Sequence, residues 1–175
     1  IDYYTHERYG VPSMYRDNEP SLEDKGIYST YLFEREALGF IKENREKPFF
    51  LYLPFNAPHG SSSLDPAIQW SVQAPPEYLA RYPGGTTARD RTRRGYKAAI
   101  TCMDDAIGQI LGLIDSLGIG SNTMVIFLSD NGGGMGSDNS PFSGRKGVLE
   151  EGGVRVPCII KWPEMFNRGQ VSGEF

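Results

Sequence analysis

The stretch NTMVIFLSDNGG, residues 122–133, decides the fold class of this chain. Its five consecutive apolar residues, Met124 to Leu128, are typical of a short strand that is buried on both faces, as in parallel sheets. Asp130 and Asn131 follow directly where this strand is expected to end, and glycines come next. Ligands of open α/β sheets bind outside the carboxyl ends of strands. The stretch therefore predicts a buried strand with a binding site at its end.

Helices and further strands are expected on both sides of this stretch. In chain order they are a helix from about Tyr31 to Asn44, a strand over 48–55 (PFFLYLPF), a helix from Tyr96 to Leu117 and a strand over Val154 to Lys161. Gly118 is expected to cap the second helix. We expect no regular element over 1–28 and a long irregular excursion over 60–94. The alternation predicts an α/β fold with a mostly parallel sheet flanked by helices.

Composition excludes some functional classes. The chain has 175 residues, 39% of them hydrophobic and 23% charged, with a formal net charge of -4. That length suits one domain, and the acidic balance argues against a general nucleic-acid binder. No apolar stretch is long enough to span a bilayer. Cys102 and Cys158 lie in apolar contexts, so we expect two buried thiols rather than a disulfide framework.

Asp130 and Asn131 offer a carboxylate and an amide oxygen side by side. Such hard oxygen donors suit Ca²⁺ or Mg²⁺, and the following glycines are expected to turn the backbone with positive φ. The alternative is a plain Asx turn at a strand end. Calcium takes about six to eight oxygen ligands, so a metal site here needs ligands from elsewhere.

His59 and Lys146 are two further candidate site residues. His59 follows the expected strand 48–55, where an imidazole can bind an anion or move a proton near neutral pH. Lys146 lies in the turn GRKG, residues 144–147, where its ammonium can reach an oxyanion. Taken singly, each residue is also compatible with a solvated surface loop.

Other charged residues favour a structural interpretation. Asp104 and Asp105 fall on the polar face of the expected helix, and the pair Asp138-Asn139 is expected to form a turn. The arginines at 89, 91, 93 and 94 are expected to be a solvated run before that helix. Attraction of anionic substrates is the alternative role for these arginines.

Four segments in order carry a family resemblance. PFFLYLPFNAPH, YKAAITCMDDAIGQIL, NTMVIFLSDNGG and GRKGVLEEGGVRVPCIIKWP together resemble the second half of the catalytic domain of type I, formylglycine-dependent sulfatases, the arylsulfatase family of the alkaline phosphatase-like superfamily. The resemblance is firm over 48–163 and looser over 1–47. It implies an alkaline phosphatase-like α/β fold and hydrolysis of sulfate esters by the intact protein.

The resemblance assigns roles by position. Asp130 and Asn131 match the pair that ligates the active-site metal, usually calcium and less often magnesium. Lys146 matches the lysine that contacts the sulfate and the catalytic residue, and His59 matches the histidine that binds the sulfate or assists the leaving oxygen. The implied substrate is a sulfated small molecule or a sulfated carbohydrate. Relatives of this kind are periplasmic, secreted or lysosomal.

The family's nucleophile is a formylglycine made from the cysteine of a Cys-x-Pro-x-Arg motif. Cys102 is followed by Met-Asp-Asp and Cys158 by Ile-Ile-Lys, so neither matches. Residues 1–175 are therefore expected to be a partial catalytic domain, inactive alone, whose nucleophile lies upstream. Two alternatives stay open: a phosphodiesterase or phosphonate monoester hydrolase of the same superfamily, and a non-catalytic anion-binding protein. With two histidines, the chain has too few for a two-metal phosphatase.

Overall fold

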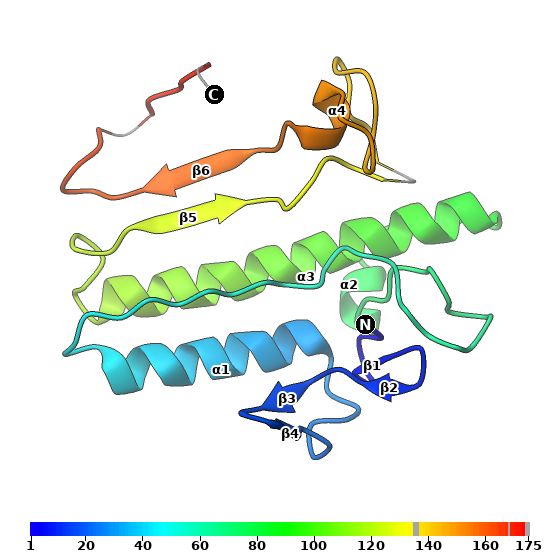
Figure 1. Cartoon of the computed structure of the whole chain (residues 1–175), viewed down its shortest axis with the longest axis horizontal. Coiled ribbons are helices and arrows are strands. Elements are labelled where there is room, and N and C mark those ends of the chain that lie inside the picture. The colour runs from blue at the N-terminus through cyan, green and yellow to red at the C-terminus, as the bar shows by residue number, and fades with distance from the viewer. Residues whose placement is uncertain (135–136, 168, 174–175) are drawn as a thin grey trace. The chain divides into compact units, whose positions relative to one another are not determined.

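The computed structural model describes residues 1–134, 137–167 and 169–173 (Figure 1). The chain forms two compact units, Ile1–Leu113 and Ile114–Phe175. The boundary falls near the end of a long helix, which begins in the first unit. None of the described helices is long and apolar enough to cross a membrane.

Short hairpins and helices build the first unit. Its elements are β1 (Glu7–Arg8), β2 (Val11–Pro12), β3 (Tyr15–Arg16), β4 (Glu19–Pro20), α1 (Ser29–Asn44), α2 (Pro76–Leu79) and α3 (Ala88–Ser116). β1 pairs with β2 and β3 with β4, both antiparallel. The helix expected near 31–44 is confirmed as α1. The two hairpins lie in the segment that was expected to be irregular.

The start of α3 differs from the prediction by eight residues, because the basic run 89–94 is helical. A capping arrangement explains the early start. The Thr87 hydroxyl donates to the Asp90 carboxylate at 2.7 Å, and the Asp90 N–H donates back to the Thr87 hydroxyl at 3.1 Å. A side chain that accepts from a first-turn N–H satisfies a donor that has no partner within the helix.

The end of α3 is as expected. Gly118 has a φ of 71°, and its N–H donates to the Asp115 carbonyl at 3.1 Å. The N–H of Ile119 donates to the Ile114 carbonyl at 3.3 Å. These two bonds around a left-handed glycine form a Schellman motif, so the predicted cap at Gly118 is confirmed.

Tyrosines and small side chains make the core of the first unit. The rings of Tyr3 and Tyr28 stack with centroids 5.2 Å apart. From α3, the buried side chains of Ala98, Ala99 and Cys102 join the same cluster. Small residues at these three positions leave room for the large rings, since protein interiors are close-packed. The burial predicted for Cys102 is confirmed.

Segment 48–55 was predicted as a strand buried on both faces, and this is wrong. It is extended, but it forms no backbone ladder within the first unit. One face packs on α1 through two edge-to-face pairs, Phe49 with Phe40 and Phe55 with Phe33. The opposite face is open, with Phe50 87% and Tyr52 76% exposed. The aromatic run is thus covered by α1 on one side and open on the other.

The second unit contains one strand pair and a short helix. β5 (Val125–Leu128) is the strand predicted at Met124–Leu128, and β6 (Cys158–Lys161) is the C-terminal half of the strand predicted at Val154–Lys161. α4 (Glu151–Val154) ends on the first residue of that segment. The pair is antiparallel, with Leu128 opposite Cys158. Parallel strands are usually joined by a crossover helix, and the only helix in the described part of this connection, 129–134 and 137–157, is the four-residue α4.

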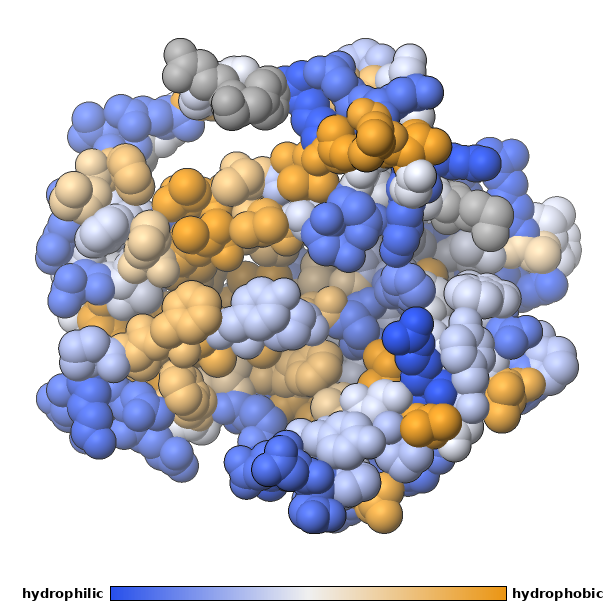
Figure 2. Space-filling view, in the orientation of Figure 1, coloured by the Kyte–Doolittle hydropathy of each residue, from blue (hydrophilic) through white to orange (hydrophobic). Residues whose placement is uncertain are grey.

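Both strands of the second unit expose apolar side chains, which Figure 2 shows as hydrophobic surface. Ile126 is 49%, Leu128 56% and Ile159 62% exposed. The predicted burial of β5 is therefore wrong for the described residues. Cys158 is exposed too, contrary to expectation, because it lies on the same uncovered pair.

Candidate active site

The loop that follows β5 is joined to two later segments by backbone hydrogen bonds. The Gly132 N–H donates to the Gly153 carbonyl at 2.9 Å, and the Lys146 N–H donates to the Gly133 carbonyl at 3.0 Å. These bonds hold the Asp130-Asn131 loop, the Lys146 loop and the start of α4 in one cluster of loops. Three of the four predicted site residues thus belong to a single substructure of the second unit.

Glycines permit the close approach of these segments. A Cβ on Gly132 would overlap the carbonyl of Gly152, and a Cβ on Gly153 would overlap the carbonyl of Val148. The positive φ expected directly after Asp130-Asn131 is not found at Gly132. Glycine is required at position 132 because a Cβ would overlap the Gly152 carbonyl. Positive φ occurs in the Lys146 loop, at Gly144 with 90° and Gly147 with 92°.

Asn139 clamps the cluster, a role that sequence reasoning missed. Its side-chain amide nitrogen donates to the carbonyls of Gly133 at 3.0 Å and Gly144 at 3.3 Å. Its side-chain oxygen accepts from the Gly133 N–H at 3.0 Å. The residue was predicted to form a plain turn. Its place between two glycine-rich segments was the available signal, because such backbone needs outside partners.

Asp130 and Asn131 follow the end of β5, where Asp130 is exposed and Asn131 is half-buried. Neither side chain forms a hydrogen bond or ion pair with any residue that the structure describes. Their oxygens are therefore available, and they fit a hard cation in kind. They do not fit in number, since among the described residues no three His, Cys, Asp or Glu side chains gather as a metal site. A calcium ion would need ligands beyond these two.

Lys146 is exposed, and its ammonium pairs with no carboxylate in the described part of the chain. Its backbone is fixed by the bond to Gly133 and by the two positive-φ glycines that flank the loop. An ammonium on a fixed loop without an internal counter-ion is suited to meet an oxyanion.

His59 belongs to the first unit, where a buried tyrosine anchors its turn. The Tyr3 hydroxyl donates to the His59 carbonyl at 2.7 Å and to the Asn56 carbonyl at 3.2 Å. The imidazole is exposed, and its Nδ1 lies 2.8 Å from the Gly60 carbonyl. A carbonyl can only accept, so Nδ1 carries a proton and Nε2 is left open for a ligand or proton.

A protein-family model described as Sulfatase matches residues 2–174. The chain belongs to the sulfatase family. It is 38% identical over 151 residues to N-acetylgalactosamine-6-sulfatase of Mus musculus, a match that covers 82% of this chain and 25% of that protein. It is 31% identical to arylsulfatase J of Mus musculus over 182 residues, covering 99% of this chain and 28% of that protein. This sulfatase chain thus spans between a quarter and three tenths of these relatives.

Solved structures agree with the family assignment. The crystal structure of Ps i-CgsB in complex with k-i-k-neocarrahexaose superposes with a TM-score of 0.69 at 32% identity, covering 85% of this sulfatase chain and 30% of that one. The PsFucS1 sulfatase from Pseudoalteromonas sp. superposes with a TM-score of 0.60 at 30% identity, covering 81% and 26%. The predicted alkaline phosphatase-like α/β fold class is confirmed.

Proposed function

We propose that the intact protein hydrolyses sulfate esters, with Asp130 and Asn131 as metal ligands and with Lys146 and His59 acting on the sulfuryl group. The loop cluster after β5 carries this proposal. It joins two oxygen donors without internal partners and one ammonium without an internal counter-ion in a single hydrogen-bonded substructure. His59 belongs to the other unit, and its role in the proposal rests on the family resemblance alone.

Calcium is the metal we propose, in preference to magnesium. When bound, it would polarise a sulfuryl oxygen as a Lewis acid. Asp130 and Asn131 would supply two of its ligands, and the larger, more flexible calcium shell accommodates further ligands from other segments more readily than magnesium does. The formylglycine nucleophile is proposed to lie outside residues 1–175, which would make this chain a part of the catalytic domain.

The chain's own residues have separable roles in this proposal. The Lys146 ammonium stabilises negative charge that develops on the sulfuryl oxygens. His59 keeps Nδ1–H on the Gly60 carbonyl and uses Nε2 toward the substrate. When protonated, Nε2 donates to the leaving alcohol oxygen, and when neutral it accepts a hydrogen bond. The hydrogen bond from the Tyr3 hydroxyl to the His59 carbonyl holds the turn in place while Nε2 acts on the substrate.

A sulfated carbohydrate is the substrate class that we favour over a sulfated small molecule. Relatives at 38% identity are named N-acetylgalactosamine-6-sulfatase, and a structural neighbour was solved with k-i-k-neocarrahexaose. Arylsulfatase J and steryl-sulfatase are also relatives, so small sulfate esters belong among the test substrates.

The test is a comparison of leaving groups with the intact protein. Sulfate release is measured from an aryl sulfate and a sulfated oligosaccharide, and turnover of a matched phosphodiester and a phosphonate monoester is measured alongside. We expect sulfate release to dominate and a metal chelator to abolish it. Faster turnover of either phosphorus substrate would favour the related hydrolases, and no turnover of any would favour a non-catalytic anion-binding protein.

A further inference from the structure

A row of cations occupies the first turns of α3 without a close ion pair. Arg89, Arg93 and Lys97 follow one another at four-residue spacing, and all three are exposed. Like charges at this spacing destabilise a helix, as do cations near its N-terminus. None of the three forms an ion pair within residues 1–113, all of which the structure describes. The fold therefore maintains an unfavourable concentration of positive charge at this place.

The nearest carboxylate is already engaged. Asp90 accepts from the hydroxyl of Thr87 at 2.7 Å and from its N–H at 3.3 Å as part of the α3 cap. It forms an ion pair with neither Arg89 nor Arg93 among the described residues. Its charge still attracts Arg93 and Arg89 at longer range, which helps to lower the pKa of Asp90 after the hydrogen bonds from Thr87, but one carboxylate does not balance all the cations around it.

A pocket of about 220 Å³ lies where the loop 82–85 meets Arg93 and Lys97 of this row. A water molecule occupies about 30 Å³ in the liquid, so the pocket has room for a group several times the size of a water molecule. Gly84 and Gly85 line it without side chains, and a Cβ on Gly85 would overlap Asp90. Arg94 also lines it, and its Nε donates to the Leu79 carbonyl at 3.0 Å. That bond orients the guanidinium beside Gly84.

We propose that this pocket is a subsite for a second sulfate group of a multiply sulfated oligosaccharide, a proposal that rests on the proposed sulfatase function and extends it. The pocket is lined by three cations, Arg93, Arg94 and Lys97, and by one carboxylate, that of Asp90. The guanidinium groups of arginine have a geometry that matches tetrahedral oxyanions. The half-buried ring of Tyr82 adds an aromatic surface for the attached sugar. The net charge of -4 on the whole chain disfavours nucleic acid as the ligand.

The kinetic test uses the intact enzyme and two oligosaccharides of equal length, one with a single sulfate and one with two. The variant is Arg93→Gln/Lys97→Gln, which leaves the oriented Arg94 in place. The matched control, Arg45→Gln/Lys47→Gln, removes one arginine and one lysine that are exposed after α1. For each enzyme, kcat/KM for the doubly sulfated substrate is divided by kcat/KM for the singly sulfated one. We expect the variant to lower this ratio about tenfold. The control should leave the ratio unchanged. An unchanged ratio in the variant, or an equal fall in the control, overturns the subsite.

A binding test separates this inference from the proposed function. Calorimetric titration of the doubly sulfated oligosaccharide is done in a Lys146→Ala background, which limits turnover. We expect Arg93→Gln/Lys97→Gln to weaken binding about tenfold and the control pair to bind normally. Single-stranded DNA of equal charge that binds as tightly would overturn the assignment to a sulfated carbohydrate. An enzyme with no sulfate-ester turnover would refute the proposed function, while this titration would still decide the subsite.

Discussion

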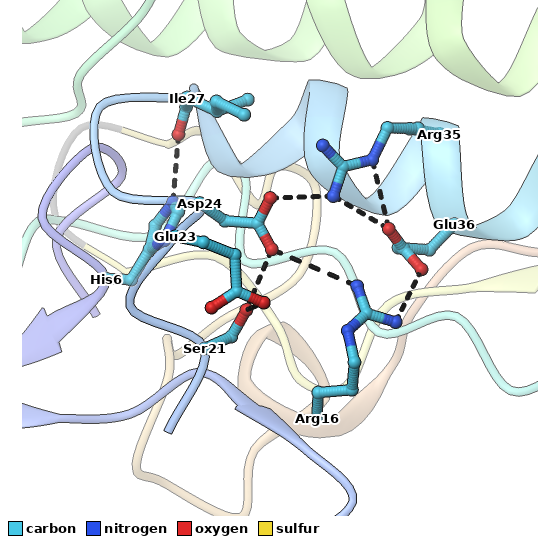
Figure 3. A network of polar contacts seen from close by, with 8 residues as sticks. All are labelled: His6, Arg16, Ser21, Glu23, Asp24, Ile27, Arg35 and Glu36. Carbon is cyan, nitrogen blue, oxygen red and sulfur yellow. Dashed lines mark hydrogen bonds and ion pairs between the residues drawn. The ribbon is translucent and has the colours of Figure 1, made fainter. Parts of the chain in front are cut away.

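Asp24 is the residue on which the polar contacts of the N-terminal segment converge (Figure 3). Its carboxylate accepts from Arg35 at 2.7 Å and from the Ser21 hydroxyl at 2.8 Å, and Arg16 lies 3.9 Å away. Glu36 bridges the same two arginines. The Arg35 hydrogen bond holds the pKa of Asp24 below its ordinary value, despite the opposing effect of burial.

This network predicts an acid-sensitive contribution to stability. Because the pKa of Asp24 is lowered by folding, its contribution is complete above the unfolded pKa of about 3.9 and is lost as the pH falls through the folded value. Asp24→Asn should cost about 1–2 kcal/mol at pH 7 and flatten the loss of stability below pH 4. Urea unfolding at pH 7 and pH 3.5 measures both. Glu46→Gln, at an exposed pair, should change neither, and an Asp24→Asn protein with wild-type acid sensitivity would contradict this account.

The two cysteines are predicted to differ in reactivity. Burial raises the pKa of Cys102 to about 12, and the thiolate is the reactive form. Cys158 is exposed on β6. In residues 1–175 expressed alone, a thiol reagent at pH 8 should label Cys158 within minutes and Cys102 only after denaturation. Mass spectrometry of the labelled peptides measures this, and equal labelling of both under native conditions would count against the described burial.

At the scale of elements, periodicity predicted helices and strands better than it predicted their surroundings. α1 and β5 were found where the apolar spacing placed them. The start of α3 was missed because a run of arginines looks like a solvated loop, whereas the capping pair Thr87 and Asp90 makes it helical. The predicted burial of 48–55 on both faces was wrong because an apolar run indicates a strand but does not show which element packs against each face.

The loop cluster after β5 offers a prediction at this scale. Gly132→Ala places a Cβ on the Gly152 carbonyl, so the loop must shift. We expect a loss of about 1–3 kcal/mol in stability and a fall of at least about 10²-fold in turnover, since small displacements of catalytic groups can cost that much.

Gly108→Ala is the matched control for this substitution. Gly108 lies in α3, and a Cβ there would meet nothing within 4 Å, so alanine should add about 0.5–1 kcal/mol through helix propensity. Thermal unfolding and sulfate release are measured for both variants. A Gly132→Ala enzyme with normal turnover would show that the cluster does not depend on this close contact.

At the scale of the whole molecule, the sequence predicted the family better than it predicted how the candidate site is assembled, and the roles of the site residues stay predictions. Motif order identified a sulfatase, and that identification is confirmed. The hydrogen bonds of Asn139 and the close contacts of Gly132 and Gly153 depend on how closely separate backbone segments approach one another. A sequence motif does not show this. Likewise, the exposure of the apolar side chains of β5 and β6 depends on which element covers these strands, and hydrophobicity alone does not identify that element.

The most direct test of the central claim compares Lys146→Ala with Asp130→Ala in the intact enzyme, measuring both sulfate-ester turnover and calcium affinity. Lys146 carries a cation and cannot ligate calcium, so its loss should lower turnover about 10²–10³-fold and leave calcium affinity nearly unchanged. Asp130→Ala should weaken calcium binding and turnover together. Near-normal turnover in Lys146→Ala, or a loss of calcium affinity as large as that in Asp130→Ala, would contradict the roles assigned to the loop cluster.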